Sequence, residues 1–362
     1  MIQPYIASPR FDLAFIIAPA FVVTAIAILA APWARTLSDF PVWLWLVLIL
    51  GVDVSHVYAS IFRTYLDRDE QRLRPRLYQL TPLLLWVAGV ALYSLGGLVF
   101  WRALAYLAIF HFVRQQYGFM MIYGRNERTG KWLDKAAIYG ATGVPLIWWL
   151  THTRSFNWFV DNDVVSLDLP FAGEAAMTVY AAILGLYAVR EVRHWRATRT
   201  VNIPKNLLLA GTALSWGIGI MAFDNDIVFT ATNVVAHGVP YLALNWLYGR
   251  NQARVQGEAT SHVAKWVAAL FRPAMVPFYV AALLVLAFCE EGLWDGLVWR
   301  DHTGVFAAFA GLPAVADPSL LIWLVPLLSL PQSTHYVLDA FIWRKGGNVP
   351  DFGRFLFGAH HD

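Results

Sequence analysis

Long apolar runs separated by short polar stretches make up most of this chain. Ten runs have the roughly 17–25 residues that a transmembrane helix needs. They cover residues 11–32, 41–62, 77–99, 101–124, 136–152, 174–192, 205–223, 227–249, 273–289 and 319–343, and the third and fourth are divided only by a short stretch with Gly-Gly and Trp-Arg. The pattern predicts an all-α fold, a polytopic integral membrane helical bundle of about ten transmembrane helices in a single transmembrane domain, residues 1–362.

Composition supports a membrane protein and excludes several classes of site. The chain is 58% hydrophobic and only 14% charged, whereas soluble domains have about 25% charged residues. Its one cysteine, Cys289, excludes an internal disulfide and any zinc or iron–sulfur site built from several thiolates. The sequence has no phosphate-binding loop and no dinucleotide-binding fingerprint, and we expect no nucleic-acid partner.

The basic residues between the runs predict an orientation. Connections on one side of the predicted bundle and the two ends together hold 22 Lys and Arg, and those on the other side hold only Arg35, Arg102, Arg154 and Arg300. Because basic loops stay on the cytoplasmic side, both termini are predicted to be cytoplasmic. The expected location is the cell membrane as a multi-pass protein, in a bacterium the inner membrane.

Four of the ten histidines fall inside predicted spans. They are His56, His111, His237 and His335, on the second, fourth, eighth and tenth spans. All four spans run in the same direction and end in a cytoplasmic arginine, so the histidines lie at similar depths, on levels roughly 8 Å apart at 1.5 Å of rise per residue. We therefore expect the four imidazoles to share one metal site.

Each of these histidines has a polar neighbour on the same helix face. Asp53 precedes His56 by three residues, and Asp339, Gln115 and Asn233 are each four residues from a histidine. Such spacings bring side chains together, and metal-bound histidines usually bond a polar group through the second nitrogen. We expect these four residues, and Arg114 three residues after His111, to be additional ligands or partners of the ligands; Arg114 at a helix end would instead reach the interface.

Imidazole and carboxylate donors without thiolate suit iron, zinc, copper or nickel. The sequence lacks the zinc-protease pattern H-E-x-x-H and the serine elbow G-x-S-x-G. Iron held by several histidines within a membrane fits oxygen chemistry. The preferred hypothesis is therefore a metal-dependent oxidoreductase that acts on a lipophilic substrate as an oxygenase, desaturase or hydroxylase. The electrons would come from the substrate or from a separate donor. No catalytic residue is assigned. In outline this resembles the membrane non-haem iron oxygenases and desaturases as a class, although the H-x(3,4)-H and H-x-x-H-H boxes of desaturases are absent.

Other interpretations remain open on the sequence. The His/Asp cluster could serve a metal-ion or proton-coupled transporter, or two histidines could ligate a b-type haem. Any single histidine could also be a hydrogen-bonded contact between helices. A short repeat, "IYGRN" after His111 and "LYGRN" after His237, suggests a weak internal duplication relating the segments around 101–126 and 227–251, but interface chemistry explains it equally well.

Overall fold

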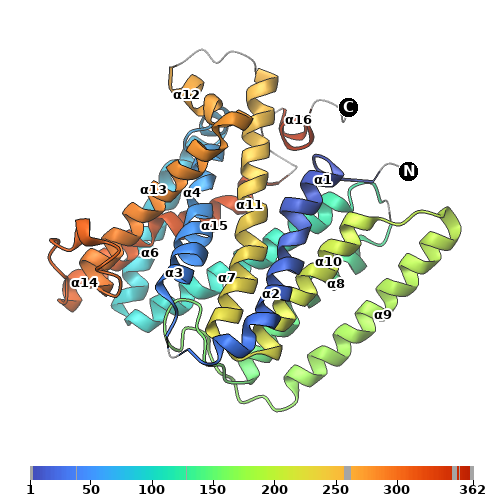
Figure 1. Ribbon diagram of the computed structural model, residues 1–362, viewed down its shortest axis with the longest axis horizontal. Helices are drawn as coiled ribbons and strands as arrows, with labels where there is room; N and C mark the ends of the chain where they lie inside the picture. Colours follow the sequence, from blue (N-terminus) through green and yellow to red (C-terminus); the bar gives the residue numbers. More distant parts are fainter. Residues whose placement is uncertain are drawn as a thin grey trace. The chain divides into compact units, whose positions relative to one another are not determined.

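A computed structural model describes residues 3–37, 39–127, 129–256, 262–344, 349 and 351–358. These residues form helices joined by turns, with no strand among them (Figure 1). Seven helices are long and apolar enough to cross a membrane: Pro9–Ala34, Val42–Arg63, Pro75–Ser94, Gly97–Tyr123, Ala172–Thr198, Asp226–Val255 and Pro273–Trp299. The all-helical architecture predicted from the sequence is therefore confirmed.

The chain divides into two compact units. Unit 1 comprises residues 1–40 and 109–240, and unit 2 comprises residues 41–108 and 241–362. Two helices, α7 (Gly97–Tyr123) and α11 (Asp226–Gln256), run through the points of division, so each contributes one part to each unit. The sequence pattern predicts a single domain. It does not mark the division into two units, because the division falls within the apolar helices α7 and α11.

Unit 1 is built around parts of α7 and α11 and five further helices. These are α1 (Pro9–Phe11), α2 (Ala18–Ala34), α8 (Lys131–Thr151), α9 (Ala172–Thr198) and α10 (Ile203–Trp216). Helix α8 packs against α9 and α10, and α10 packs against α2. An aromatic cluster of Phe112, Trp149, Phe156, Trp216 and Phe229 forms part of its core; large rings of this kind dominate the apolar surface that a helix pair buries.

A buried cluster of charges joins the helices of unit 1. Lys205 at the start of α10 is fully buried, and its Nζ lies 2.7 Å from Glu127 Oε2 and 3.1 Å from Glu191 Oε1. Arg190 on α9 donates to Asp134 on α8, which is also fully buried. Because each buried charge has an opposite partner, the desolvation cost is offset within the cluster.

Unit 2 consists of shorter and more irregular helices around its parts of α7 and α11. They are α3 (Val42–Trp45), α4 (Ser55–Ala59), α5 (Arg68–Leu73), α6 (Pro75–Ser94), α12 (His262–Leu270), α13 (Val276–Trp294), α14 (Pro318–Leu328), α15 (Leu330–Ile342) and α16 (Phe352–Phe357). Helix α6 packs against α14 and α15, and α13 packs against α4. A π-helical segment, Leu46–Val54, connects α3 to α4, and a 3₁₀ turn, Ser60–Arg63, follows α4.

The remaining three predicted spans are also helical. Residues 136–152 correspond to α8, and residues 205–223 correspond to α10 with the π-helical segment Gly217–Ala222 after it. The predicted span 319–343 is two helices, since α14 ends at Leu328 and α15 begins at Leu330. Pro331, at the start of α15, has no N–H to donate to the preceding turn, so a proline here favours a break. The count of ten spans stays a prediction.

The two copies of the repeated motif lie at different places on their helices: the first is at the end of α7, and the second lies inside α11, which continues to Gln256. In unit 1, the hydroxyl of Tyr123 donates to the Asp12 carboxylate at 3.0 Å and so holds the N-terminal segment. In unit 2, Asn251 donates its amide to the carbonyl of Phe355 in α16 at 3.0 Å. Each motif thus fixes a terminal segment of the chain to its own unit, and an internal duplication remains a prediction.

Candidate metal centre

The segment that carries His56 is irregular before it is helical. Residues Leu46–Val54 are π-helical, and the hydroxyl of Ser55 donates to the carbonyl of Leu50 at 2.8 Å. This hydroxyl bonds a carbonyl of the wider π-helical turn, and such turns occur often at functional sites. The following short helix α4 holds His56, whose side chain is fully buried.

Unit 2 brings two of the predicted histidines into direct ring contact. The ring centroids of His56 and His335 are 5.1 Å apart, with the rings nearly perpendicular at 76°. Nδ1 of His56 lies 3.6 Å from Asp53 Oδ1, and Nδ1 of His335 lies 3.7 Å from Asp339 Oδ1. The hydroxyl of Tyr241 donates to Asp339 Oδ1 at 2.6 Å. Each imidazole therefore has a carboxylate beside it on its own helix, slightly beyond direct hydrogen-bond distance.

Unit 1 brings the other two predicted histidines together in the same way. The centroids of His111 on α7 and His237 on α11 are 4.9 Å apart, at an interplanar angle of 76°. Phe112 stacks on His237 at 3.6 Å and 8°, which fixes the plane of that imidazole. Gln115 donates its amide to the backbone carbonyl of His237 at 2.9 Å. The glutamine thus ties α7 to α11 at the histidine itself.

A proline explains why Gln116 bonds α11 at this point. Pro240 lies inside α11 and has no N–H for the carbonyl of Ala236, four residues earlier. Gln116 on α7 donates to that carbonyl at 3.5 Å, and its own carbonyl oxygen accepts from the Thr212 hydroxyl at 3.0 Å. The carbonyl that the proline leaves without a helical donor is therefore bonded by a neighbouring helix, as buried backbone groups require.

The other two predicted neighbours have different surroundings. Asn233 is buried, and its amide donates to the carbonyl of Phe229 within α11 at 2.9 Å. Arg114 is exposed, donates to the Tyr139 hydroxyl at 2.7 Å, and lies over the Tyr117 ring at 4.8 Å. Within unit 1, the guanidinium thus interacts with aromatic side chains and α8.

These buried histidines could hold a metal ion, since each offers a ring nitrogen in an apolar setting. A second group of possible metal-binding residues in unit 1 consists of Glu127, Asp134 and Glu191. The ammonium of Lys205 and the guanidinium of Arg190 already lie among those carboxylates. That group is therefore neutralised by the protein's own cations and is a structural cluster.

Three side chains at the histidines were not predicted from the sequence. They are Phe112, Gln116 and Tyr241, and the ring of Tyr241 contacts both His56 and His335, with centroids 5.6 and 5.0 Å away. Tyr241 follows His237 by four residues, the spacing that identified the other neighbours, so the same rule applied to aromatic residues would have found it. The pairing of Phe112 and Gln116 with α11 depends on tertiary packing.

Comparisons with protein-family models, with curated proteins and with solved structures gave no match to this chain. Function is therefore argued from the site alone.

Proposed function

We propose that this protein is an integral-membrane, metal-dependent oxidoreductase whose metal is held by His56, His111, His237 and His335. Iron is the metal we expect first, acting on a lipophilic substrate by oxygenation, desaturation or hydroxylation. The observation that carries this proposal is the pair of imidazoles in ring contact inside each unit. All four side chains are at most 4% exposed.

The continuity of α11 supports a single shared metal. His237, which contacts His111 in unit 1, and Tyr241, which contacts His56 and His335 in unit 2, lie on this one helix. Four residues correspond to about 6 Å along a helix and return to the same face. One helix therefore carries a residue of the first histidine pair and a residue that contacts the second, which supports the proposal of one shared metal.

The chemistry of the donors supports a metal that works without sulfur ligands. Imidazole with nearby carboxylate is a typical donor set for non-haem iron, and zinc and copper accept the same donors. Asp53 and Asp339, each beside a histidine, would orient the imidazoles and increase their basicity. When bound, iron would supply the redox chemistry, and the surrounding apolar side chains would hold the substrate and exclude water.

Geometry within each unit favours a non-haem site. The two imidazoles of a pair touch edge to face, at centroid distances of 5.1 and 4.9 Å. A haem held by one such pair would have to lie between the two rings, and rings already in contact leave no space for it. The alternative function is a carrier that moves a metal ion or protons by means of the same histidines. The metal analysis described below distinguishes it from the oxidoreductase.

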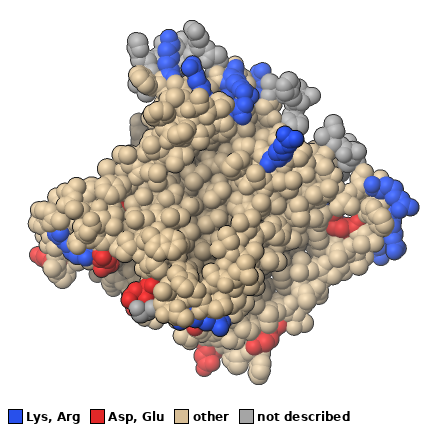
Figure 2. Space-filling model, viewed as in Figure 1, with Lys and Arg blue, Asp and Glu red and all other residues tan. Residues whose placement is uncertain are grey.

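Charge at the helix ends supports the proposed location and orientation. Figure 2 shows Lys and Arg side chains at the end of α9, where Arg193, Arg196 and Arg199 are exposed, and, in unit 2, over α12 and the C-terminal end of α11. Basic ends of this kind stay cytoplasmic. We therefore propose a multi-pass protein of the cell membrane, the inner membrane of a bacterium, with these ends on the cytoplasmic side. The terminal residues 1, 2 and 359–362 lie outside the described residues.

Metal analysis with a visible absorption spectrum of the detergent-purified protein tests the proposal. The expected result is stoichiometric iron without the Soret band of a haem. A Soret band would instead establish haem. Protein that contains no tightly bound metal but transports metal into proteoliposomes would contradict the oxidoreductase and support the carrier.

Replacing Asp339 by Asn is expected to weaken metal binding by roughly 10–100-fold, the usual cost of losing a partner of a metal-bound histidine. Asparagine keeps the size of the side chain but removes the charge beside His335 Nδ1, and competition with a chelator measures the affinity. Asp295→Asn is the matched control, because Asp295 is also buried but accepts from the backbone N–H of His302. Equal affinities in the two variants would contradict an orienting role for Asp339.

A further inference from the structure

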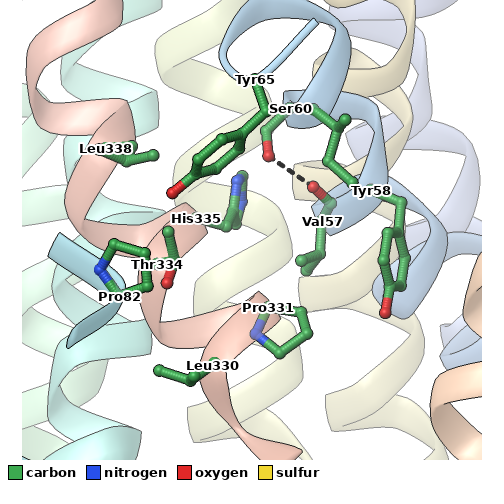
Figure 3. A pocket seen from close by; sticks show the side chains of 11 residues that line it. Val57, Tyr58, Ser60, Tyr65, Pro82, Leu330, Pro331, Thr334, His335 and Leu338 are labelled. Carbon is green, nitrogen blue, oxygen red and sulfur yellow. Dashed lines mark hydrogen bonds between the residues drawn. The ribbon is translucent and has the colours of Figure 1, made fainter. Parts of the chain in front are cut away.

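A cavity of about 280 Å³, partly open to the outside, lies in unit 2 beside one of the proposed metal ligands. Its walls come from α4 and the following 3₁₀ turn, from α6 at Pro82, and from the junction of α14 with α15. In Figure 3, the His335 ring lies between Tyr65 and Thr334 on one side and Val57 and Tyr58 on the other. The cavity therefore reaches one of the four buried imidazoles directly.

The cavity lies where the surrounding helices are irregular. Helix α4 tightens into the 3₁₀ turn Ser60–Arg63, and the α14–α15 break places Pro331 in the wall. Pro82 contributes a second ring from inside α6. Prolines and changes of helix type prevent regular side-chain interdigitation, so space remains between these elements.

The walls are apolar, and the hydroxyls of Ser60 and Tyr65 in them are already bonded to backbone carbonyls. The hydroxyl of Ser60 donates to the carbonyl of Val57 at 2.6 Å, and that of Tyr65 donates to the carbonyl of Tyr78 at 3.0 Å. Thr334 differs: its side chain is 7% exposed, and its Oγ1 has no hydrogen-bond partner among the residues the structure describes. A buried hydroxyl left without a partner is unfavourable, which points to a bound group as its partner.

Part of the cavity wall is open to the outside. Pro82, Leu330 and Pro331 in the wall are each partly exposed, and the neighbouring Leu83 on α6 and Leu327 on α14 are 52% and 49% exposed. Exposed leucines on helices of this kind contact lipid chains. An apolar molecule dissolved in the bilayer can therefore approach the cavity from the membrane.

We propose that this cavity binds a single hydrocarbon chain of a membrane lipophile and that Thr334 Oγ1 donates a hydrogen bond to an oxygen on that chain. The volume is near the lower end of the range for ligand sites, roughly 300–1,000 Å³, so the cavity takes a chain segment rather than a whole lipid. The bonded oxygen fixes the chain, and the carbons next to it lie at His335. The identification of this chain as the substrate rests on the proposed function, whereas the binding itself does not require a metal.

Photolabelling with a long-chain fatty alcohol that carries a diazirine within its chain tests this site. We expect adducts on cavity residues such as Ile61 and Leu338, and we expect excess unlabelled fatty alcohol to suppress them. Leu330→Trp, which fills the cavity, should abolish this labelling, whereas Leu327→Trp, on the neighbouring exposed surface, should leave it intact. Adducts spread evenly over exposed side chains, without competition, would overturn the proposal.

The hydroxyl of Thr334 is tested separately. Thr334→Val should weaken competition by the unlabelled alcohol about fivefold, the effect of one hydrogen bond of about 1 kcal/mol, and Thr334→Ser should retain most of it. Equal competition in both variants would overturn the role of Thr334. Metal content is measured on the same samples. Saturable labelling of the cavity without bound metal would support the lipid-binding cavity and contradict the proposed function. Stoichiometric metal without labelling would support the proposed function and contradict the lipid-binding cavity.

Discussion

Replacing His335 by alanine is expected to remove tightly bound metal from the purified protein while the helical content stays unchanged. This imidazole is buried, contacts His56, and has Asp339 beside its Nδ1. Loss of a ligand should exceed the roughly 10–100-fold loss of affinity that follows removal of a partner outside the ligand set. The measurements are the metal content after purification and the circular dichroism spectrum.

His194→Ala is the control for the loss of any histidine. His194 is exposed near the end of α9, where its ring nitrogen lies near the Thr200 hydroxyl. Full metal content is expected in this variant, together with thermal stabilisation by added metal as in the unmodified protein. If His335→Ala retained stoichiometric metal, this histidine would not be a ligand.

Replacing Lys205 by methionine is expected to lower the free energy of unfolding by about 3–5 kcal/mol, the cost of removing one partner from a buried ion pair. Methionine keeps the apolar stem but leaves Glu127 and Glu191 without the ammonium between them. Arg190 alone then balances Asp134 and Glu191. Denaturant unfolding in detergent, followed by circular dichroism, measures the change.

Lys131→Met is the matched control, since Lys131 is an exposed lysine at the start of α8. We expect it to change the unfolding free energy by less than about 1 kcal/mol, as exposed charges usually do. A comparably small effect of Lys205→Met would show that the buried charge cluster does not hold unit 1 together.

The helices could be predicted from the sequence because length and apolarity are local properties. The predicted spans overlap helices throughout, and even the poorly marked boundary between the third and fourth spans is a real turn, at Gly96, whose φ of +142° favours glycine. The break within 319–343 was missed because a leucine-rich run continues through it. The division into two units falls inside α7 and α11 and leaves no local mark.

The candidate site was predictable only in part. Helical spacing correctly placed Asp53 beside His56 and Asp339 beside His335, because those pairs share one helix. Spacing cannot say which imidazoles meet across helices, since that depends on tertiary packing. Helical spacing likewise does not predict the partner of Arg114, whose guanidinium donates to the Tyr139 hydroxyl on α8.

The number of metal ions per chain, measured in two paired variants, tests the central claim most directly. One variant is His56→Ala with His335→Ala, and the other is His111→Ala with His237→Ala. If all four imidazoles hold one metal, the unmodified protein contains one ion per chain and each paired variant contains none. Two ions per chain, with one kept in each paired variant, would show two separate sites, and no ion in the unmodified protein would contradict a metal centre altogether.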